Sequence, residues 1–307
     1  MIDRILNKFS PQRRHLLSEI NVLKNELETT RQLLGKLASE ICAKDIRSSE
    51  FKVYSQFGED GIIQYLVNNV KIDKKIFIEF GVENYTEANT RFLLLKDNWK
   101  GLIIDGSKEY MDFVKSQDLY WRHDLTAVAQ FITRDNINEI FAKHGFTGEI
   151  GILSVDIDGN DYWVWEQINN VDPAIVIAEY NSVFGYEHAI TVPYIPDFYR
   201  TNYHTSNLYW GCSLKALNVL AERKGYALVG CNNNGNNCFF VKKSLLPAHI
   251  RQLTVQEAYV ESKYRESRDE NGQLTYITGK DRMKVIKDME VVDVEKNEKK
   301  TIAQLLR

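Results

Sequence analysis

The chain has 307 residues and a formal net charge of −3 at pH 7, from 39 Lys or Arg against 42 Asp or Glu. This balance provides no basic field for a phosphate backbone, so we expect no nucleic-acid partner. Hydrophobic residues make up 44% of the chain, which excludes global disorder. No run approaches the roughly 18 apolar residues of a membrane span.

The cysteines and the start of the sequence indicate a compartment. Four cysteines without a CxxC pair are typical of a reduced protein. The opening MIDRILNKFSPQRR lacks the apolar stretch of a secretory leader. We therefore expect a cytoplasmic protein.

Residues 12–43 carry the longest helical pattern. The apolar residues at heptad-like spacing are Leu16, Ile20, Leu23, Leu27, Leu34, Leu37 and Ile41. Such a seam fits a coiled-coil or helical-hairpin arm, and equally a long helix that packs on its own domain. The sequence predicts a helical arm over residues 1–50, through which we expect a homo-oligomer.

From residue 51 the pattern changes to alternating strands and helices. Strands are expected at 76–80, 101–105, 119–122, 150–157 and 174–179, with helices at 61–69, 86–96, 108–116, 127–144 and 160–169. A helix at 213–224 and an antiparallel hairpin of strands 226–231 and 238–242 follow. This alternation predicts an α/β fold with a Rossmann-like sheet of seven strands, doubly wound and mostly parallel.

The α/β domain is expected over residues 51–250, with an aromatic lid at 181–210. Residues 251–307 are charged and predict a C-terminal extension of mixed helix and strand. Runs such as GKDRMK and VEKNEKK indicate solvated surface, and we expect no chemistry there.

In an open α/β sheet the ligand lies over the carboxyl ends of the strands. Gly81 follows the first strand, where a glycine lets the backbone approach a ligand closely. Asp105 follows the second strand, and a carboxylate there can accept hydrogen bonds from both hydroxyls of a ribose. Asp124 and Leu125 follow the expected third strand and would contact adenine, unless Asp124 only caps the next helix.

Acidic residues gather after the fourth and fifth strands. Asp156, Asp158 and Asp161 follow one strand, and Glu179 and Asn181 follow the next. Oxygen-rich clusters of this kind suit Mg²⁺. The alternative is that these side chains cap a helix and bind backbone groups.

The lid supplies candidate substrate contacts. Its polar aromatic side chains suit a sugar-like or aromatic substrate, although a lid that merely packs on the core would look the same. The candidates are Tyr186, His188, Tyr194 and Tyr203, and His188 is also the best candidate for a general base.

Several strings together resemble the FkbM-like class I methyltransferases of bacterial surface-glycan and capsule type. They are SQFGEDGII at 55–63, IFIEFGVEN at 76–84, GLIIDGS at 101–107, HDLTA at 123–127, ILSVDIDGNDYW at 152–163, IVIAEYNS at 175–182 and GYALVGCNNNGNNCFFV at 225–241. The resemblance covers residues 51–243. This chain has Val82 and Glu83 where that family has small residues in its glycine-rich first motif.

The resemblance implies S-adenosylmethionine as the cofactor. The cofactor-binding residues that it implies are Ser55, Gln56, Glu79, Gly81, Glu83, Asn84, Asp105, Gly106, Ser107, Asp124, Leu125 and Asp156. Ser55 and Gln56 would cover the cofactor carboxylate, and Asp156 would lie beside the methionine amine and the transferred methyl group.

The resemblance also implies methyl transfer to an oxygen or nitrogen of a sugar, a nucleotide sugar or another surface-polysaccharide precursor. Mg²⁺ would be held by Asp156 or Asp158 with Glu179 and Asn181, as in some related O-methyltransferases. Without a metal, Asp158 or His188 would act as the general base.

Two other functions fit parts of the sequence. Asp156-Ile157-Asp158 is a DxD motif, which a metal-dependent glycosyltransferase could use to hold a nucleotide sugar. A methyltransferase-like fold could also serve as a non-enzymatic assembly subunit that associates through residues 12–43.

Overall fold

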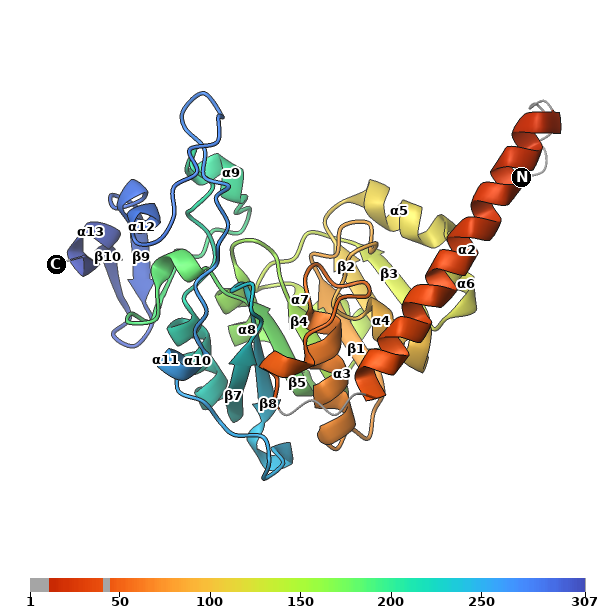
Figure 1. Ribbon diagram of the computed structural model, residues 1–307. Coiled ribbons are helices and arrows are strands. Elements are labelled where there is room, and N and C mark those ends of the chain that lie inside the picture. Colours follow the sequence, from red (N-terminus) through yellow and green to blue (C-terminus); the bar gives the residue numbers. More distant parts are fainter. Residues whose placement is uncertain (1–10, 41–44, 307) are drawn as a thin grey trace. The chain divides into compact units, whose positions relative to one another are not determined.

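The computed structural model describes residues 11–40 and 45–306 (Figure 1). The chain divides into two compact units, Met1–Cys42 and Ala43–Arg307. No helix in the described ranges is both long enough and apolar enough to cross a bilayer.

The first unit contains the helix α2, Pro11–Glu40. The seam side chains from Leu16 to Leu37 are exposed, with exposed fractions between 37% at Ile20 and 63% at Leu23. Ile41, the last predicted seam residue, lies outside the described residues. The predicted helix is confirmed, and its apolar stripe faces solvent.

The second unit is built on a seven-stranded sheet of order β3-β2-β1-β4-β5-β8-β7. Its strands are β1 Ile76–Phe80, β2 Lys100–Asp105, β3 Leu125–Ala129, β4 Gly148–Val155, β5 Val171–Glu179, β7 Tyr226–Cys231 and β8 Asn237–Lys242. β1 to β5 are parallel to one another, and β8 is antiparallel to both β5 and β7. The predicted α/β fold with a Rossmann-like seven-stranded sheet is therefore confirmed (Figure 1).

Helices cover both faces of this sheet. They are α3 Glu59–Asn69, α4 Arg91–Asp97, α5 Lys108–Ser116, α6 Asp118–Arg122, α7 Ile137–Lys143, α8 Asp161–Gln167 and α10 Leu214–Arg223. On β1, Ile78 and Phe80 pack with α7, α8 and α10, whereas Phe77 packs with α3, α4 and α5. Burial on both faces explains why β1 is an almost continuous apolar run.

The third strand differs from the prediction. Residues 119–122 belong to the helix α6. β3 is Leu125–Ala129, and its last three residues lie where the start of a helix at 127–144 was expected. In α6, Arg122 pairs with Asp118 at 2.8 Å, one helical turn away, and Trp121 is 72% exposed. The aromatic run was therefore wrongly read as a strand, and the alanine-rich strand as a helix.

A second, three-stranded sheet has the order β10-β9-β6. It joins the predicted lid to the C-terminal extension through β6 Ile190–Thr191, β9 Glu290–Asp293 and β10 Glu298–Thr301. Four short helices and three 3₁₀ turns complete the described part of the unit. The helices are α9 Arg200–Tyr203, α11 Val255–Ala258, α12 Asp281–Val285 and α13 Ile302–Leu305, and the turns are η1 Arg47–Ser49, η2 Ser182–Phe184 and η3 Lys243–Leu245. The two segments share an apolar core that includes Phe198, Trp210 and Ile286.

Candidate functional site

A cavity of about 690 Å³ lies at the carboxyl ends of the parallel strands. We call it the main cavity. It is lined by residues that follow β1, β2, β3 and β4, by part of the segment 198–207, and by Glu266. Its volume and its position are those of small-molecule sites in open α/β sheets.

Gly81 brings the end of β1 against the end of β4. Its φ is +74°, and a Cβ atom added there would lie 1.7 Å from the carbonyl oxygen of Asp156. Its N–H donates to the carbonyl of Ile104 at 3.0 Å. A side chain at this position would both strain the backbone and separate the two strand ends.

Asp105 is fixed at the wall of the main cavity by two turns. Its Oδ1 accepts from the backbone N–H of Ser107 and its Oδ2 accepts from that of Glu83, both at 2.8 Å. Each carboxylate oxygen keeps a lone pair for a further donor. Gly81, Glu83, Asp105, Gly106 and Ser107 all line the cavity, as their predicted roles require.

The structure does not place the predicted adenine contacts, Asp124 and Leu125, in the lining of the main cavity. Asp124 precedes β3 instead of following a strand, and it pairs with Lys100 at 3.4 Å at the start of β2. Leu125 is buried in the apolar core. The residues after β3 that line the cavity are Gln130, Phe131 and Ile132. The apolar–polar–apolar order of Leu125, Thr126 and Ala127 is the sequence signal that would have placed this strand correctly.

Asp161 organises the turn after β4. Its carboxylate oxygens accept from the backbone N–H groups of Ile157 at 2.8 Å and Gly159 at 2.9 Å. Burial nevertheless raises its pKa to about 6. Asp158, with a φ of +56°, leans out of this turn toward Arg200.

Asp156 and Glu179 form a pair of neighbouring carboxyl groups at the ends of β4 and β5. Burial raises the pKa of Asp156 well above its usual value, and the nearby charges of Asp158 and Asp161 add to this effect. Burial and the charge of Asp156 likewise raise the pKa of Glu179. Two like charges so close together cannot both ionise readily, so the pair shares a proton.

The carboxyl pair connects two cavities. Asp156 lines the main cavity, whereas Glu179 lines a second cavity of about 130 Å³. Within the described part of the chain, Glu179 Oε2 is inaccessible to solvent and has no hydrogen-bond partner.

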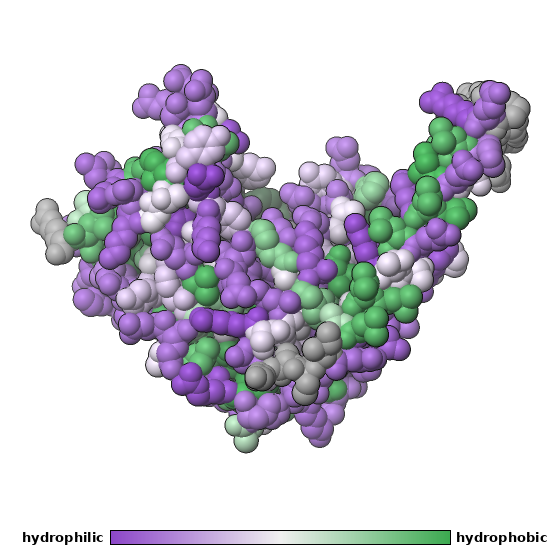
Figure 2. All heavy atoms as spheres, in the orientation of Figure 1, coloured by the Kyte–Doolittle hydropathy of each residue, from purple (hydrophilic) through white to green (hydrophobic). Residues whose placement is uncertain are grey.

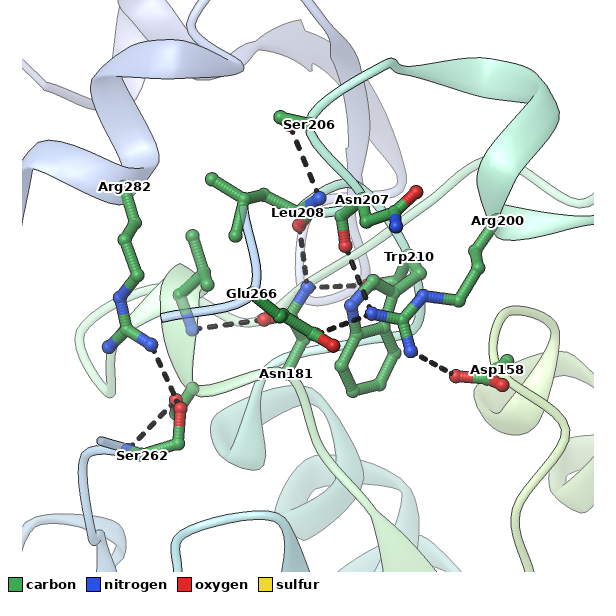
Figure 3. Close-up of polar contacts among 12 residues, drawn as sticks. Asp158, Asn181, Arg200, Ser206, Asn207, Leu208, Trp210, Ser262, Glu266 and Arg282 are labelled. Atoms are coloured by element: carbon green, nitrogen blue, oxygen red, sulfur yellow. Dashed lines mark hydrogen bonds and ion pairs between the residues drawn. The ribbon is translucent and has the colours of Figure 1, made fainter. Parts of the chain in front are cut away.

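The predicted metal site is not supported. Among the described residues, no group of three or more His, Cys, Asp or Glu side chains is arranged to hold a metal ion. Asn181 donates to the carbonyls of Leu208 at 3.0 Å and Trp210 at 2.9 Å, and its oxygen accepts from Val183 N–H at 3.0 Å (Figure 3). Its amide therefore holds the lid in place, while Asp158 is paired with an arginine.

That arginine, Arg200, was missed by the sequence analysis. Its guanidinium donates to Asp158 at 2.7 Å, to Glu266 at 2.6 Å and to the carbonyl of Asn207 at 3.1 Å (Figure 3). It also lies 4.9 Å from the ring centroid of Trp210. Burial disfavours its charged form, but the carboxylates of Asp158 and Glu266 outweigh this and raise its pKa.

Glu266 brings residues 251–307, where the sequence analysis expected no chemistry, to the candidate site. It lines both cavities, and Ser262, Tyr264 and Arg282 from the same extension line the second one. Because these residues lie far along the chain from the strand ends, no local motif connects them with the site.

Other predicted cofactor residues stabilise turns. Ser55 exchanges hydrogen bonds with buried Asp60. The carboxylate of Glu79 accepts from the backbone N–H groups of Asn89 at 2.8 Å and Thr90 at 3.0 Å. The side chain of Asn84 accepts from the backbone N–H of Thr86 at 3.0 Å. Gln56 lines the second cavity instead of the main one.

The four predicted substrate residues line neither cavity. His188 is half-buried, and its backbone carbonyl accepts from Ser213 Oγ at 2.7 Å. Tyr186 packs on Tyr259. The guanidinium carbon of Arg134 lies 4.1 Å from the ring centroid of Tyr194. Tyr203 stacks on Phe198, with 4.6 Å between the two ring centroids. The lid aromatics that face the main cavity are Phe198 and Tyr199.

No protein-family model matches this chain, and no curated protein matches it. Solved structures do match. The N-terminal domain of EvdMO1 with SAH bound is 11% identical with a TM-score of 0.40, over 69% of this chain and 94% of that one. An S-adenosylmethionine-dependent methyltransferase from Clostridium acetobutylicum is 11% identical with a TM-score of 0.38, and the match covers 60% of this chain and 89% of that one. An O-methyltransferase from Bacillus cereus in complex with SAH is 10% identical with a TM-score of 0.35, and the match covers 55% of this chain and 74% of that one. Likenesses this weak assign no activity to this chain.

The close approach at Gly81 gives a first prediction. We expect Gly81→Ala to lower the free energy of unfolding by about 3 kcal/mol or more, because the new Cβ adds a clash to the strain of positive φ. Gly145 is the matched control, since its φ is +77° but no atom lies within 4 Å of the position of a Cβ. Gly145→Ala should lower it by only about 1 kcal/mol. Equal losses in urea unfolding would contradict the close approach.

The carboxyl pair gives a second prediction. A carboxyl group whose pKa is raised by folding stabilises the protein at low pH, and this stability is lost as the pH rises through the folded pKa. The free energy of unfolding of Glu179→Gln should therefore rise relative to that of the unchanged protein as the pH goes from 5 to 8. The increase in this difference should be about 1–3 kcal/mol. Urea unfolding at both pH values measures this, with exposed Glu187→Gln as control. A difference that does not depend on pH would show that the pair does not share a proton.

Proposed function

We propose that this protein is an S-adenosylmethionine-dependent methyltransferase. The observation that carries the proposal is the fixed carboxylate of Asp105 beside Gly81 in the main cavity. Asp105 offers two oriented oxygens, which match the two vicinal hydroxyls of a ribose. The absence of a side chain at Gly81 gives a bound ligand access to the backbone at the end of β1.

The rest of the main cavity fits the other parts of that cofactor. Phe131 offers an apolar ring beside Gly106, with a separation of 3.4 Å between its Cδ2 and a Cβ position on that glycine. Together with Ile104 and Ile132 it forms a surface on which a flat adenine ring would pack. Asp156, at the opposite side of the Gly81 turn, would meet the cationic methionine end. S-adenosylmethionine, when bound, supplies a methyl group that is already activated for transfer.

The protein's own contribution would be positioning and exclusion of water. In-line transfer requires the acceptor atom to face the methyl group within a dry site. Arg200, held by two carboxylates, covers the cavity from the lid side. Asp156 and Glu179 lie beside the expected position of the acceptor, and the carboxylate form of this pair would take the role of base that the sequence suggested for His188 or Asp158.

We further propose that the acceptor is a hydroxyl oxygen of a sugar, a nucleotide sugar or another surface-polysaccharide precursor. The resemblance in residues 51–243 and the polar lining of the second cavity support this class. The glycosyltransferase alternative has no comparable support, because Asp156 pairs with Glu179 and Asp158 pairs with Arg200 instead of converging on one cation.

Calorimetric titration with S-adenosylhomocysteine tests the cofactor. We expect a dissociation constant on the order of micromolar, equal in Mg²⁺ and in EDTA. Asp105→Asn should weaken binding by roughly 10-fold or more, through the loss of a charged acceptor. Asp112→Asn, which changes an exposed acid on α5, is the matched control. No binding would overturn the proposal and favour a non-enzymatic role, and a requirement for Mg²⁺ would restore the metal hypothesis.

A further inference from the structure

An ion pair lies where the main cavity meets the second cavity. Among the described residues, Arg200 and Glu266 are the two that line both cavities. Arg200 comes from the lid and Glu266 from the C-terminal extension, and their side chains meet at 2.6 Å. Figure 3 shows the guanidinium of Arg200 between Asp158 and Glu266, next to the ring of Trp210. The lid and the C-terminal extension therefore both contribute to both cavities.

Glu179, which lines the second cavity, has an unsatisfied acceptor. Glu179 Oε2 is inaccessible to solvent and has no hydrogen-bond partner in the described structure. A buried acceptor without a donor is unfavourable by about 1–3 kcal/mol, so such atoms usually bind a water or a ligand. A hydroxyl group is the simplest donor that also fits the proposed chemistry.

The charges around the second cavity are already balanced. Arg282 is only 2% exposed, and it donates to Ser262 at 2.9 Å and to Glu261 at 3.1 Å. Arg200 is held by two carboxylates. Neither guanidinium is left without a carboxylate for a phosphate or sulfate group, so the cavity favours an uncharged ligand.

We propose that the second cavity is the acceptor subsite and takes the uncharged, hydroxyl-bearing end of a sugar, with one hydroxyl donating to Glu179 Oε2. Its volume of about 130 Å³ equals that of roughly four liquid waters, which suits one edge of a ring. The indole of Trp210 lines the cavity as an apolar face for that ring. This inference rests on the proposed function.

The test measures methyl transfer from S-adenosylmethionine to the methyl glycosides of glucose, galactose, mannose, fucose and rhamnose, with glucose 6-phosphate and UDP-glucose as charged comparisons. We expect transfer to at least one uncharged glycoside. Glu179→Met, which keeps the volume but removes the acceptor, should raise the KM for that glycoside about tenfold or more and leave the dissociation constant of S-adenosylhomocysteine within twofold. Glu179→Gln should have a smaller effect, and Glu187→Gln none.

The outcomes separate this inference from the proposed function. Tight binding of S-adenosylhomocysteine with an unchanged KM in Glu179→Met would overturn the subsite alone. So would transfer only to glucose 6-phosphate, or to none of the probes. A failure of the unchanged protein to bind S-adenosylhomocysteine would overturn the proposed function, and the subsite with it.

A separate observation concerns the helix α2. Its exposed seam places Leu16, Leu23, Thr30 and Leu37 at d positions and Ile20, Leu27 and Leu34 at a positions of a heptad. Figure 2 shows apolar side chains gathered along this helix. A lone amphipathic helix is only marginally stable in water, so a stripe of this length calls for a partner.

The charged residues beside the seam specify that partner. Glu19 and Glu26 occupy g positions, and Lys24 and Arg31 occupy e positions. In a parallel, in-register pair each g residue meets the e residue five positions later on the other helix, which opposes Glu19 to Lys24 and Glu26 to Arg31. An antiparallel pair would oppose acid to acid and base to base.

We infer that α2 forms a parallel, in-register two-stranded coiled coil with a second copy of this chain. Light scattering after size-exclusion chromatography should give twice the chain mass of 35.6 kDa. The double variant E19K/E26K and the double variant K24E/R31E should each be monomeric, and their mixture should form a heterodimer. A monomeric unchanged chain, or no recovery on mixing, would overturn the inference.

Disulfide trapping tests the orientation. In a Cys42→Ser background, Leu16→Cys should cross-link two chains under mild oxidation, because identical d positions face each other when the helices are parallel. Ser18→Cys, on the outer face of the same turn, should not. Cross-linking from Ser18 alone, or a dimer that Leu16→Cys fails to trap, would show a different arrangement.

Discussion

The close contact between the turn after β1 and the turn after β4 determines the candidate site. Gly81 permits this contact because a Cβ atom would lie 1.7 Å from the carbonyl oxygen of Asp156. With the two strand ends this close, Asp105 on one neighbouring strand and Glu179 on the other are drawn to the same edge of the sheet. The main cavity and the carboxyl pair both follow from that spacing.

Buried acids in this chain have two different roles. Asp60 accepts three backbone N–H groups on one oxygen, and Glu79 accepts two on its carboxylate. These contacts offset part of the cost of burial and stabilise the loops around β1, although Asp60 Oδ1 has no partner among the described residues. Glu179 lies beside Asp156, and its Oε2 likewise has no hydrogen-bond partner within the described ranges. Polar groups left so poorly satisfied are typical of sites that await a ligand.

The lid and the C-terminal extension form one body over the carboxyl edge of the sheet. The strands β6, β9 and β10 pair across about one hundred residues of sequence, and Asn181 ties the lid to the end of β5. Arg200 and Glu266 meet at the boundary between the two cavities. The extension therefore helps to build the site instead of serving only as solvated surface.

The sequence alone determined the α/β sheet and several residues of its binding edge. Apolar runs of strand length followed by Gly81, Asp105 and Asp156 suffice, because parallel strands place their carboxyl ends together whatever the details of packing. The heptad pattern similarly determined α2. Local signals failed at β3, where small residues in a strand and aromatics in a short helix reversed the usual preferences.

Only the tertiary structure decided which polar residues face the cavities. Glu79 and Asn181 looked like ligands, but backbone N–H and carbonyl groups from other segments use their hydrogen-bonding capacity. Arg200, Glu266 and the unpartnered oxygen of Glu179 became candidates because chain segments far apart in sequence meet there. Such contacts depend on long-range packing, which no local spacing of residues records.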